Sequence, residues 1–150
     1  MNRVYIHYGA DHFDKKLFNI PKGGYYGINK PTGGLWGSPV DSNWTWKDWC
    51  EGERYHLERL KKSFRFTLAN GSKVFHIRTA NDIEKLPIAK YPESDFISIG
   101  WYYDWDKIIS KYDAVELHIS NDYALFHDLF YCWDVDSIIV LNPDVIREVE

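Results

Sequence analysis

The sequence predicts a single α+β domain with strands at both ends of the chain. Its 150 residues fit one domain of ordinary size. Near the start, Val4 and Ile6 alternate with polar or aromatic residues, which is typical of a half-buried strand. Near the end, the apolar run over residues 137–141 is typical of a fully buried strand. Segments with helical spacing lie between them, so we expect helices and strands within one domain, residues 1–150.

The first half of the chain is predicted to hold a strand, a long loop and a helix. Residues 3–8 form the strand, which ends at Gly9. One or two helical turns follow over residues 11–18, and the irregular stretch 20–43 is interpreted as a long functional loop. A helix over residues 44–61 begins at a cap formed by Ser42 or Asn43, and Gly52 weakens it near its middle.

An Asn-Gly pair in the middle of the chain predicts a β-hairpin. Asn70 and Gly71 lie between two alternating segments, residues 64–68 and 74–78. Asn-Gly favours the tight turn that joins two antiparallel strands. The two segments are therefore expected to pair with each other.

The second half of the chain is predicted to alternate short helices and strands. Residues 81–86, 105–112 and 122–131 have the capping residues and spacing of helices. Residues 114–119 and 137–141 are predicted strands, and residues 145–149 add a strand at a sheet edge.

Composition argues against several classes of protein. The formal charge is −4, and the one basic cluster is Lys61, Lys62 and Arg65, which does not favour a nucleic-acid binder. No apolar run approaches the roughly 20 residues that span a bilayer, so no membrane association is expected. The chain has two cysteines, and its first residues lack the apolar core of a signal peptide. These observations favour a reducing cytoplasm. Aromatic residues make up 17% of the chain, so some rings are expected to line a ligand site or a contact surface.

Common enzyme signatures are missing from the sequence. It holds no phosphate-binding Gly-rich motif, no His-Glu-x-x-His and no Gly-x-Ser-x-Gly. The six histidines lie far apart along the chain, a spacing that argues against a zinc enzyme. A metal-dependent nuclease or hydrolase would need clustered carboxylates, which Glu116, Asp134 and Asp136 could supply, although their spacing is generic.

Three short segments have residue types suited to ligand binding. In the first, His7-Tyr8-Gly9 closes the first predicted strand, where an imidazole and a bare backbone can meet a ligand. The second is the glycine-rich segment 33–39, whose Trp36 offers a flat stacking surface. The third comprises the carboxylates Asp136 and Glu116 near late strands, which could stabilise positive charge on a sugar. Each also has a purely structural explanation, as a strand histidine, turn glycines or solvated carboxylates.

Taken in order, these segments resemble the ADP-ribosyltransferase superfamily, in particular the branch of the poly-ADP-ribose polymerases and diphtheria toxin. That branch has a first-strand His and Gly, a Gly-x-Gly strand leading into a Ser-containing helix start, and a late strand that begins with Glu and ends in Asn-Pro. The matching stretches here are His7-Tyr8-Gly9, residues 33–42 and residues 137–143. Tyr8 is an insertion between His7 and Gly9, and the Glu position falls on Ser137, or on Asp136 after a shift of one residue.

The resemblance implies two small, mainly antiparallel sheets that form a cleft for NAD. The Gly9 backbone would hold the nicotinamide amide, the nicotinamide ring would lie beside Trp36 or Tyr25-Tyr26, and His7 would bind the adenosine-side ribose. Asp136 first, and Glu116 second, would stabilise the oxocarbenium-like transition state, while Lys30 or Arg3 could meet the pyrophosphate. In the resemblance, the catalytic residues are Asp136, Glu116 and His7, and the cofactor contacts come from His7, Tyr8, Gly9, Tyr26, Gly34, Trp36 and Ser38.

Two functions remain open at this point. The first is an NAD-dependent mono-ADP-ribosyltransferase, similar to toxin or phage-type effectors, that modifies a macromolecule, with a protein target favoured over nucleic acid. The second is a partner-binding module without chemistry, which would dock through exposed aromatic residues such as Trp44 and Trp49. Loss of NAD turnover on changing His7 or Asp136 would separate the first from the second.

Overall fold

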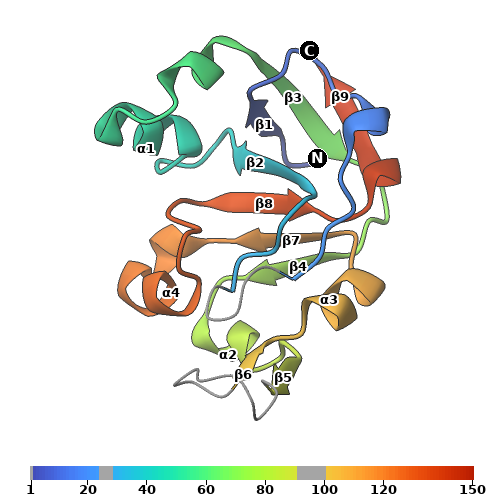
Figure 1. Ribbon diagram of the computed structural model, residues 1–150, viewed down its shortest axis with the longest axis vertical. Coiled ribbons are helices and arrows are strands. Elements are labelled where there is room, and N and C mark those ends of the chain that lie inside the picture. The colour runs from blue at the N-terminus through green and yellow to red at the C-terminus, as the bar shows by residue number, and fades with distance from the viewer. Residues whose placement is uncertain (1, 24–28, 91–100) are drawn as a thin grey trace.

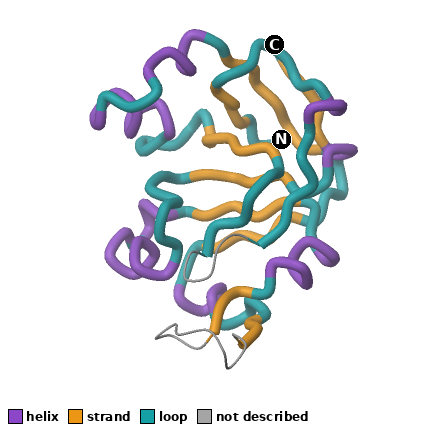
Figure 2. The backbone as a smooth tube through the Cα atoms, viewed as in Figure 1, coloured by secondary structure: helices purple, strands orange, loops and turns teal. Residues whose placement is uncertain are grey.

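The computed structural model describes residues 2–23, 29–90 and 101–150 (Figure 1). Strands gather in the centre of this part of the chain and helices lie around them (Figure 2). The strands are β1 (Tyr5–Tyr8), β2 (Leu35–Pro39), β3 (Ser63–Leu68), β4 (Val74–Ile77), β5 (Ile88–Lys90), β6 (Trp101–Tyr103), β7 (Ala114–Leu117), β8 (Ser137–Val140) and β9 (Ile146–Val149). The α-helices are α1 (Trp46–Glu53), α2 (Ala80–Ile83), α3 (Trp105–Lys111) and α4 (Tyr123–Leu129), and short 3₁₀ helices cover Lys15–Leu17, Leu57–Lys61, Ile119–Asn121 and Pro143–Val145.

The α+β prediction is confirmed, but in place of the two small sheets that the resemblance implies there is one large mixed sheet and one small sheet. The described strands form a seven-stranded sheet in the order β4-β7-β8-β2-β1-β3-β9, and β5 pairs with β6 in a separate two-stranded sheet. Neighbours in the main sheet are antiparallel except β4 and β7, which run parallel. The predicted edge strand near the C-terminus is confirmed as β9.

Strand β2 joins the two halves of the main sheet. Its first three residues pair with β8, from Leu35 opposite Val140 to Gly37 opposite Ile138. Its last two residues pair with β1, where Ser38 lies opposite Ile6 and Pro39 opposite Tyr5. In Figure 1 the strands β1, β3 and β9 run steeply, whereas β8, β7 and β4 run nearly horizontally. The sheet therefore changes direction along β2.

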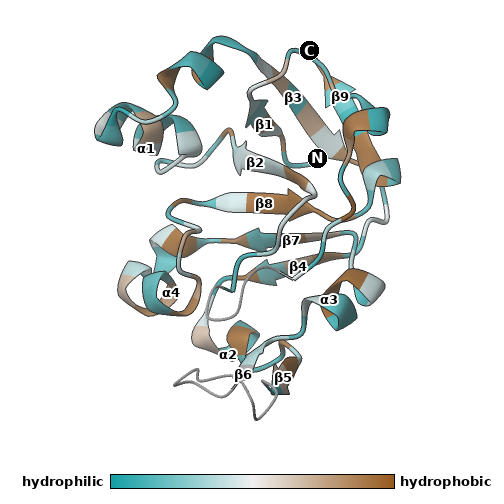
Figure 3. Cartoon of the chain, in the orientation of Figure 1, coloured by the Kyte–Doolittle hydropathy of each residue, from teal (hydrophilic) through white to brown (hydrophobic). Residues whose placement is uncertain are grey.

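Each face of the sheet buries its own apolar cluster, because side chains alternate along a strand. On one face Val115 and Ile139 pack with Trp105 and Ile108 of α3 and Phe126 of α4. The other face forms a second cluster, made by Tyr5, Leu35, Phe64, Phe66, Leu68, Ala114, Ile138, Val140, Val145 and Ile146. Strand β8 supplies residues to both clusters, which explains why it is apolar over most of its length (Figure 3).

The predicted hairpin is wrong, although both of its strands form. Strand β3 pairs with β1 and β9, while β4 pairs with β7 on the opposite edge of the sheet. A tight turn does form at Asn70-Gly71, with the Ser72 N–H donating to the Ala69 carbonyl at 3.2 Å. Beyond it, the Lys73 N–H donates to the carboxylate of Asp113, which draws the chain toward β7. The turn therefore forms, but it does not pair the two strands that flank it.

The helix predicted over residues 44–61 is shorter than expected. Thr45, rather than Ser42 or Asn43, caps α1 in a reciprocal capping box with Asp48. The helix ends after Glu53 because Arg54 takes a left-handed conformation with φ of 53°. A separate 3₁₀ helix covers the rest of the predicted span, at Leu57–Lys61.

The predicted loop over residues 20–43 contains the strand β2. The glycines in and around this strand are typical of a loop, which is why the strand was not predicted. Gly37 is required because β2 crosses the second apolar cluster at close range. A Cβ atom there would lie 2.9 Å from two ring atoms of Phe66, a buried residue of β3. The strand can therefore pass over the Phe66 ring only without a side chain at this position.

Replacing Gly37 by alanine should lower the free energy of unfolding by about 1–3 kcal/mol, because the Phe66 ring must move. Adding Phe66→Leu to Gly37→Ala should recover part of this loss, and urea unfolding of both proteins measures it. Gly52→Ala is the matched control, since nothing lies within 4 Å of its added methyl and α1 should gain about 0.5–1 kcal/mol. If Gly37→Ala and Gly52→Ala changed the free energy of unfolding equally, the close approach at Gly37 would be contradicted.

Candidate functional site

Three neighbouring strands carry the segments that the sequence analysis selected. His7 lies on β1, Trp36 lies on β2, and Asp136 immediately precedes β8. These strands are consecutive in the sheet, in the order β8-β2-β1. Segments from opposite ends of the chain are thus brought side by side. Glu116 lies one strand further, on β7.

His7 marks the point where β1 and β2 stop pairing. The last backbone pair is Ile6 opposite Ser38, and the His7 Nδ1 then donates to the Trp36 carbonyl at 2.7 Å. Because a carbonyl can only accept, this bond fixes the proton on Nδ1 and leaves Nε2 as the acceptor of the ring. The imidazole is half-buried and packs against Phe64, with 5.2 Å between ring centroids. The fold therefore sets both the orientation and the tautomer of His7.

Burial lowers the pKa of His7, an effect that its bond to the Trp36 carbonyl only partly offsets. A depressed pKa means that the folded protein resists protonation while the unfolded chain takes up a proton near pH 6.5. The stability of the wild type should therefore fall more steeply than that of His7→Gln as the pH decreases from 7 to 5, by at most about 1.4 kcal/mol per pH unit. Urea unfolding at several pH values measures this, and parallel profiles would contradict it.

Trp36 and the glycines before it are held by intramolecular contacts. The Trp36 indole packs edge-on against Trp133, donates from Nε1 to the Gly33 carbonyl at 3.1 Å and lies 4.8 Å from the Lys30 ammonium. Gly33 and Gly34 have φ values of 75° and 67°, and a Cβ on Gly34 would lie 2.8 Å from Ile139. Packing thus accounts for these glycines, and the indole remains half-buried.

Other predicted cofactor contacts also have partners within the fold. The Ser38 hydroxyl is buried and accepts from the Trp46 N–H at 2.9 Å, which ties β2 to the start of α1. The Gly9 N–H donates to the Lys62 carbonyl at 2.8 Å. Tyr8 is half-buried, and burial raises the pKa of its phenol. The Lys30 ammonium donates to the Cys132 carbonyl at 2.7 Å, and Tyr25 and Tyr26 lie outside the described residues.

Asp136 holds three segments together at the start of β8. Its carboxylate accepts from the Ser42 hydroxyl at 2.7 Å, from the Ser120 N–H at 2.9 Å and from the Ser120 hydroxyl at 2.6 Å. Asp136 is only 6% exposed. The carboxylate predicted as the leading catalytic group therefore also connects β8 to the loops before α1 and α4.

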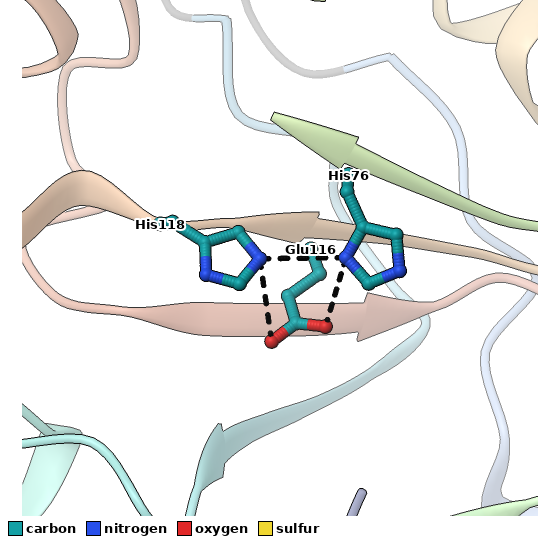
Figure 4. Close-up of side chains that lie close together, drawn as sticks. All are labelled: His76, Glu116 and His118. Atoms are coloured by element: carbon teal, nitrogen blue, oxygen red, sulfur yellow. Dashed lines mark hydrogen bonds and ion pairs between the residues drawn. The ribbon is translucent and has the colours of Figure 1, made fainter. Parts of the chain in front are cut away.

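Glu116 lies at the centre of a buried cluster of polar residues. Its side chain is fully buried and is bonded by Arg3 and by the Tyr5 hydroxyl, the latter at 2.8 Å. His76 Nδ1 lies 3.3 Å from one carboxylate oxygen, and His118 Nε2 lies 3.7 Å from the other (Figure 4). Burial alone would raise the pKa of Glu116, but bonds from His76 and Tyr5 and the charge of Arg3 together hold it below its usual value. Glu116 is therefore a carboxylate surrounded by donors.

The pairing of β4 with β7 assembles this cluster. His76 of β4 is the direct cross-strand partner of Glu116 in the parallel register. His118 follows Glu116 by two residues, so both side chains leave the chain on the same face. The alternating Glu-x-His pattern of residues 116–118 was the signal for two of the three residues, and the analysis of spacing along the chain missed it. No local signal identifies His76 as the third.

Aromatic residues also gather at the end of α1. Trp46 and Trp49 are stacked with 5.0 Å between ring centroids, and Tyr55 packs edge-on against both. Tyr55 is 46% exposed. Trp44 is fixed separately, because its Nε1 donates to the Asp134 carbonyl at 2.7 Å. The exposed aromatic residues of this region are therefore Trp44, which is 36% exposed, and Tyr55, whereas Trp46 and Trp49 are half-buried.

Among the described residues, no helix is both long and apolar enough to pass through a bilayer.

Comparison with known proteins identified no relative of this chain. No family model matches the chain, and no curated protein and no solved structure matches it significantly.

Proposed function

We propose that the protein is an NAD-dependent mono-ADP-ribosyltransferase that modifies a macromolecular target, a protein in preference to a nucleic acid. The observation that supports this proposal is the order β8-β2-β1, which places Asp136, Trp36 and His7 on adjacent elements. The ADP-ribosyltransferase resemblance requires these three segments to be neighbours. In this proposal NAD binds where the sheet changes direction along β2, between the half with β1 and β3 and the half with β7 and β8.

In this proposal the fold orients NAD for loss of nicotinamide. His7 Nε2 accepts from a hydroxyl of the adenosine-side ribose, because Nδ1 is already committed to the Trp36 carbonyl. The bond from the ribose carbon to the nicotinamide nitrogen breaks with its electron pair moving to the nitrogen, so nicotinamide leaves neutral. A nucleophilic atom of the target then donates an electron pair to the ribose carbon and releases its proton to solvent.

Two carboxylates compete for the role of stabilising the oxocarbenium-like ribose. Asp136 is the first choice because it lies at the start of β8, where the resemblance expects a catalytic acidic residue. Its three donors come from Ser42 and Ser120, and these would have to share it with the sugar. Glu116 is the second choice, and the bonds from Arg3 and Tyr5 would compete in the same way.

The experiment incubates the purified protein with NAD and a cell lysate. It follows nicotinamide release and the gain in mass of one ADP-ribose on any macromolecule. Asp136→Asn should lower the rate of release by about 100-fold or more if this carboxylate stabilises the transition state, and Glu116→Gln should do so if Glu116 does. His7→Gln should weaken NAD binding, which calorimetry measures.

The matched control is His12→Gln, since His12 has an exposed imidazole and lies on the same N-terminal segment. This variant should release nicotinamide at the wild-type rate. Absence of both NAD binding and nicotinamide release in the folded wild-type protein would overturn the proposal.

The stacked pair of Trp46 and Trp49 supports a second candidate function, a partner-binding module. The two rings are half-buried beside the exposed Tyr55, and partly accessible, pre-packed aromatic rings are typical of residues that contribute most to binding at protein interfaces. If this function is correct, Trp49→Ala should prevent retention of a partner from a lysate, while His7→Gln should leave retention unchanged. Retention that needs neither residue would contradict it.

A further inference from the structure

We propose that His76, Glu116 and His118 form a binding site for one divalent transition-metal ion, of which Zn²⁺ is the best match. The ligand atoms of the three residues all lie within 4.8 Å of one another. This inference does not rest on the proposed transferase function, whose leading carboxylate is Asp136, and it is tested by binding of the metal ion. The histidine spacing along the sequence argues against a zinc enzyme, but sheet pairing brings these distant residues together.

The distances within the cluster match those between ligands of one metal ion and are at the long end for direct hydrogen bonds. His76 Nδ1 lies 3.3 Å from both His118 Nε2 and a Glu116 oxygen, and His118 Nε2 lies 3.7 Å from the other oxygen. Ordinary N–H···O bonds are shorter, with a mode of about 2.9–3.0 Å. Zinc ligands at about 2.0–2.1 Å in a tetrahedron lie roughly 3.3–3.4 Å from one another. Small movements of the Glu116 carboxylate would therefore bring its oxygens to the separation expected between the ligands of a tetrahedral zinc ion.

Two paired strands of the main sheet hold the three side chains. His76 and Glu116 are cross-strand partners in the interior of the β4–β7 ladder, and His118 directly follows β7 (Figure 4). Glu116 is fully buried and His118 is only 13% exposed at its side chain. The site is thus largely preformed, which reduces the entropy lost when a metal ion binds.

Arg3 and Tyr5 supply the outer contacts that metal-binding carboxylates usually have. Each donates to one oxygen of Glu116, and each oxygen retains a second lone pair for the metal. The charge of Arg3 is shared with Asp41, whose carboxylate lies 2.9 Å from the guanidinium. This sharing reduces the repulsion between the guanidinium and a metal ion at Glu116.

A pocket lined in part by His76 adjoins the cluster, and in this proposal a water molecule from it takes the remaining coordination position. The pocket has a volume of about 340 Å³, and its walls include Arg3, Tyr5, His76 and Arg78. Three protein ligands and one water molecule would complete a four-coordinate site of the open type. The donor set of two imidazoles and one carboxylate favours Zn²⁺ or Co²⁺ over Mg²⁺ and Ca²⁺, which prefer oxygen ligands.

The test titrates chelator-treated protein with Zn²⁺ by calorimetry and with Co²⁺ by visible absorption. We expect one ion per chain, with the intense visible bands of four-coordinate Co²⁺. His118→Asn and His76→Asn should each lower the Zn²⁺ affinity by at least about 100-fold, because each removes a ligand. The matched control His12→Asn removes an exposed imidazole and should bind Zn²⁺ as the wild type does.

Nitrogen NMR of the wild-type imidazoles gives a second readout that needs no variant. Zinc should shift Nδ1 of His76 and Nε2 of His118, since these are the atoms that face Glu116. Shifts confined to exposed histidines such as His12 and His56 would overturn the proposal, as would the absence of saturable Zn²⁺ binding. A protein that binds Zn²⁺ at this site but does not turn over NAD would contradict only the transferase proposal. The failures of the two proposals can therefore be told apart.

Discussion

Replacing Glu116 by alanine should lower the free energy of unfolding by about 3 kcal/mol or more. The fully buried carboxylate accepts from Arg3 and Tyr5 and lies beside His76 and His118. Its removal leaves the Tyr5 hydroxyl and part of the Arg3 guanidinium buried without their acceptor, and breaking a buried ion pair on one side costs about 3–5 kcal/mol. Urea unfolding in the presence of a chelator measures the effect without any contribution from bound metal.

Asp41 offers a matched control, because it binds the other side of the same guanidinium. Its carboxylate lies 2.9 Å from Arg3, and its side chain is 63% exposed, whereas that of Glu116 is fully buried. Exposed ion pairs contribute about 0–1 kcal/mol, so Asp41→Ala should change the free energy of unfolding by no more than that. Similar losses for both variants would show that Arg3 pairing, and not burial of the Glu116 carboxylate, determines the stability.

The sequence allowed secondary structure to be predicted where the signal is local. The predicted strands over residues 137–141 and 114–119 are confirmed as β8 and β7, and the predicted helix over residues 105–112 is confirmed as α3, each within one to two residues. The hairpin at Asn70-Gly71 was wrong because the turn is local and the choice of strand partner is not. Which strand pairs with β3 depends on β1 and β9, which lie far away in the sequence.

The residues of the candidate site also fall into two groups, those that the sequence indicated and those that only the structure brings together. That His7, Trp36 and Asp136 belong to one site could be proposed from ordered motifs, and the structure makes β1, β2 and β8 neighbours, with Asp136 immediately before β8. The partners of Glu116 could not be proposed, since His76 reaches it only through the parallel pairing of β4 with β7. Parallel pairing needs a long crossover connection and leaves no tight-turn signal in the sequence.

Replacing Asp136 by alanine should also cost about 3 kcal/mol of the free energy of unfolding. The buried carboxylate accepts three hydrogen bonds from Ser42 and Ser120, and each donor left unpaired costs about 1–3 kcal/mol unless water reaches it. Ser120 is exposed, so water can replace part of the hydrogen bonding that its N–H and hydroxyl lose. Thermal and urea unfolding of Asp136→Ala beside the wild type measure the difference.

Asp136→Asn separates the structural contribution of this carboxylate from a chemical one. An asparagine oxygen can accept from the Ser120 N–H, and its amide can donate to the Ser42 hydroxyl, so this variant should lose clearly less stability than Asp136→Ala. If Asp136 stabilises a positively charged ribose, the stable Asn variant should still lose nicotinamide release, because the negative charge is gone. If Asp136 only connects β8 to its neighbouring loops, activity should follow stability across the two variants, and an Asn variant that is both stable and active would assign the chemistry to Glu116 or to neither carboxylate.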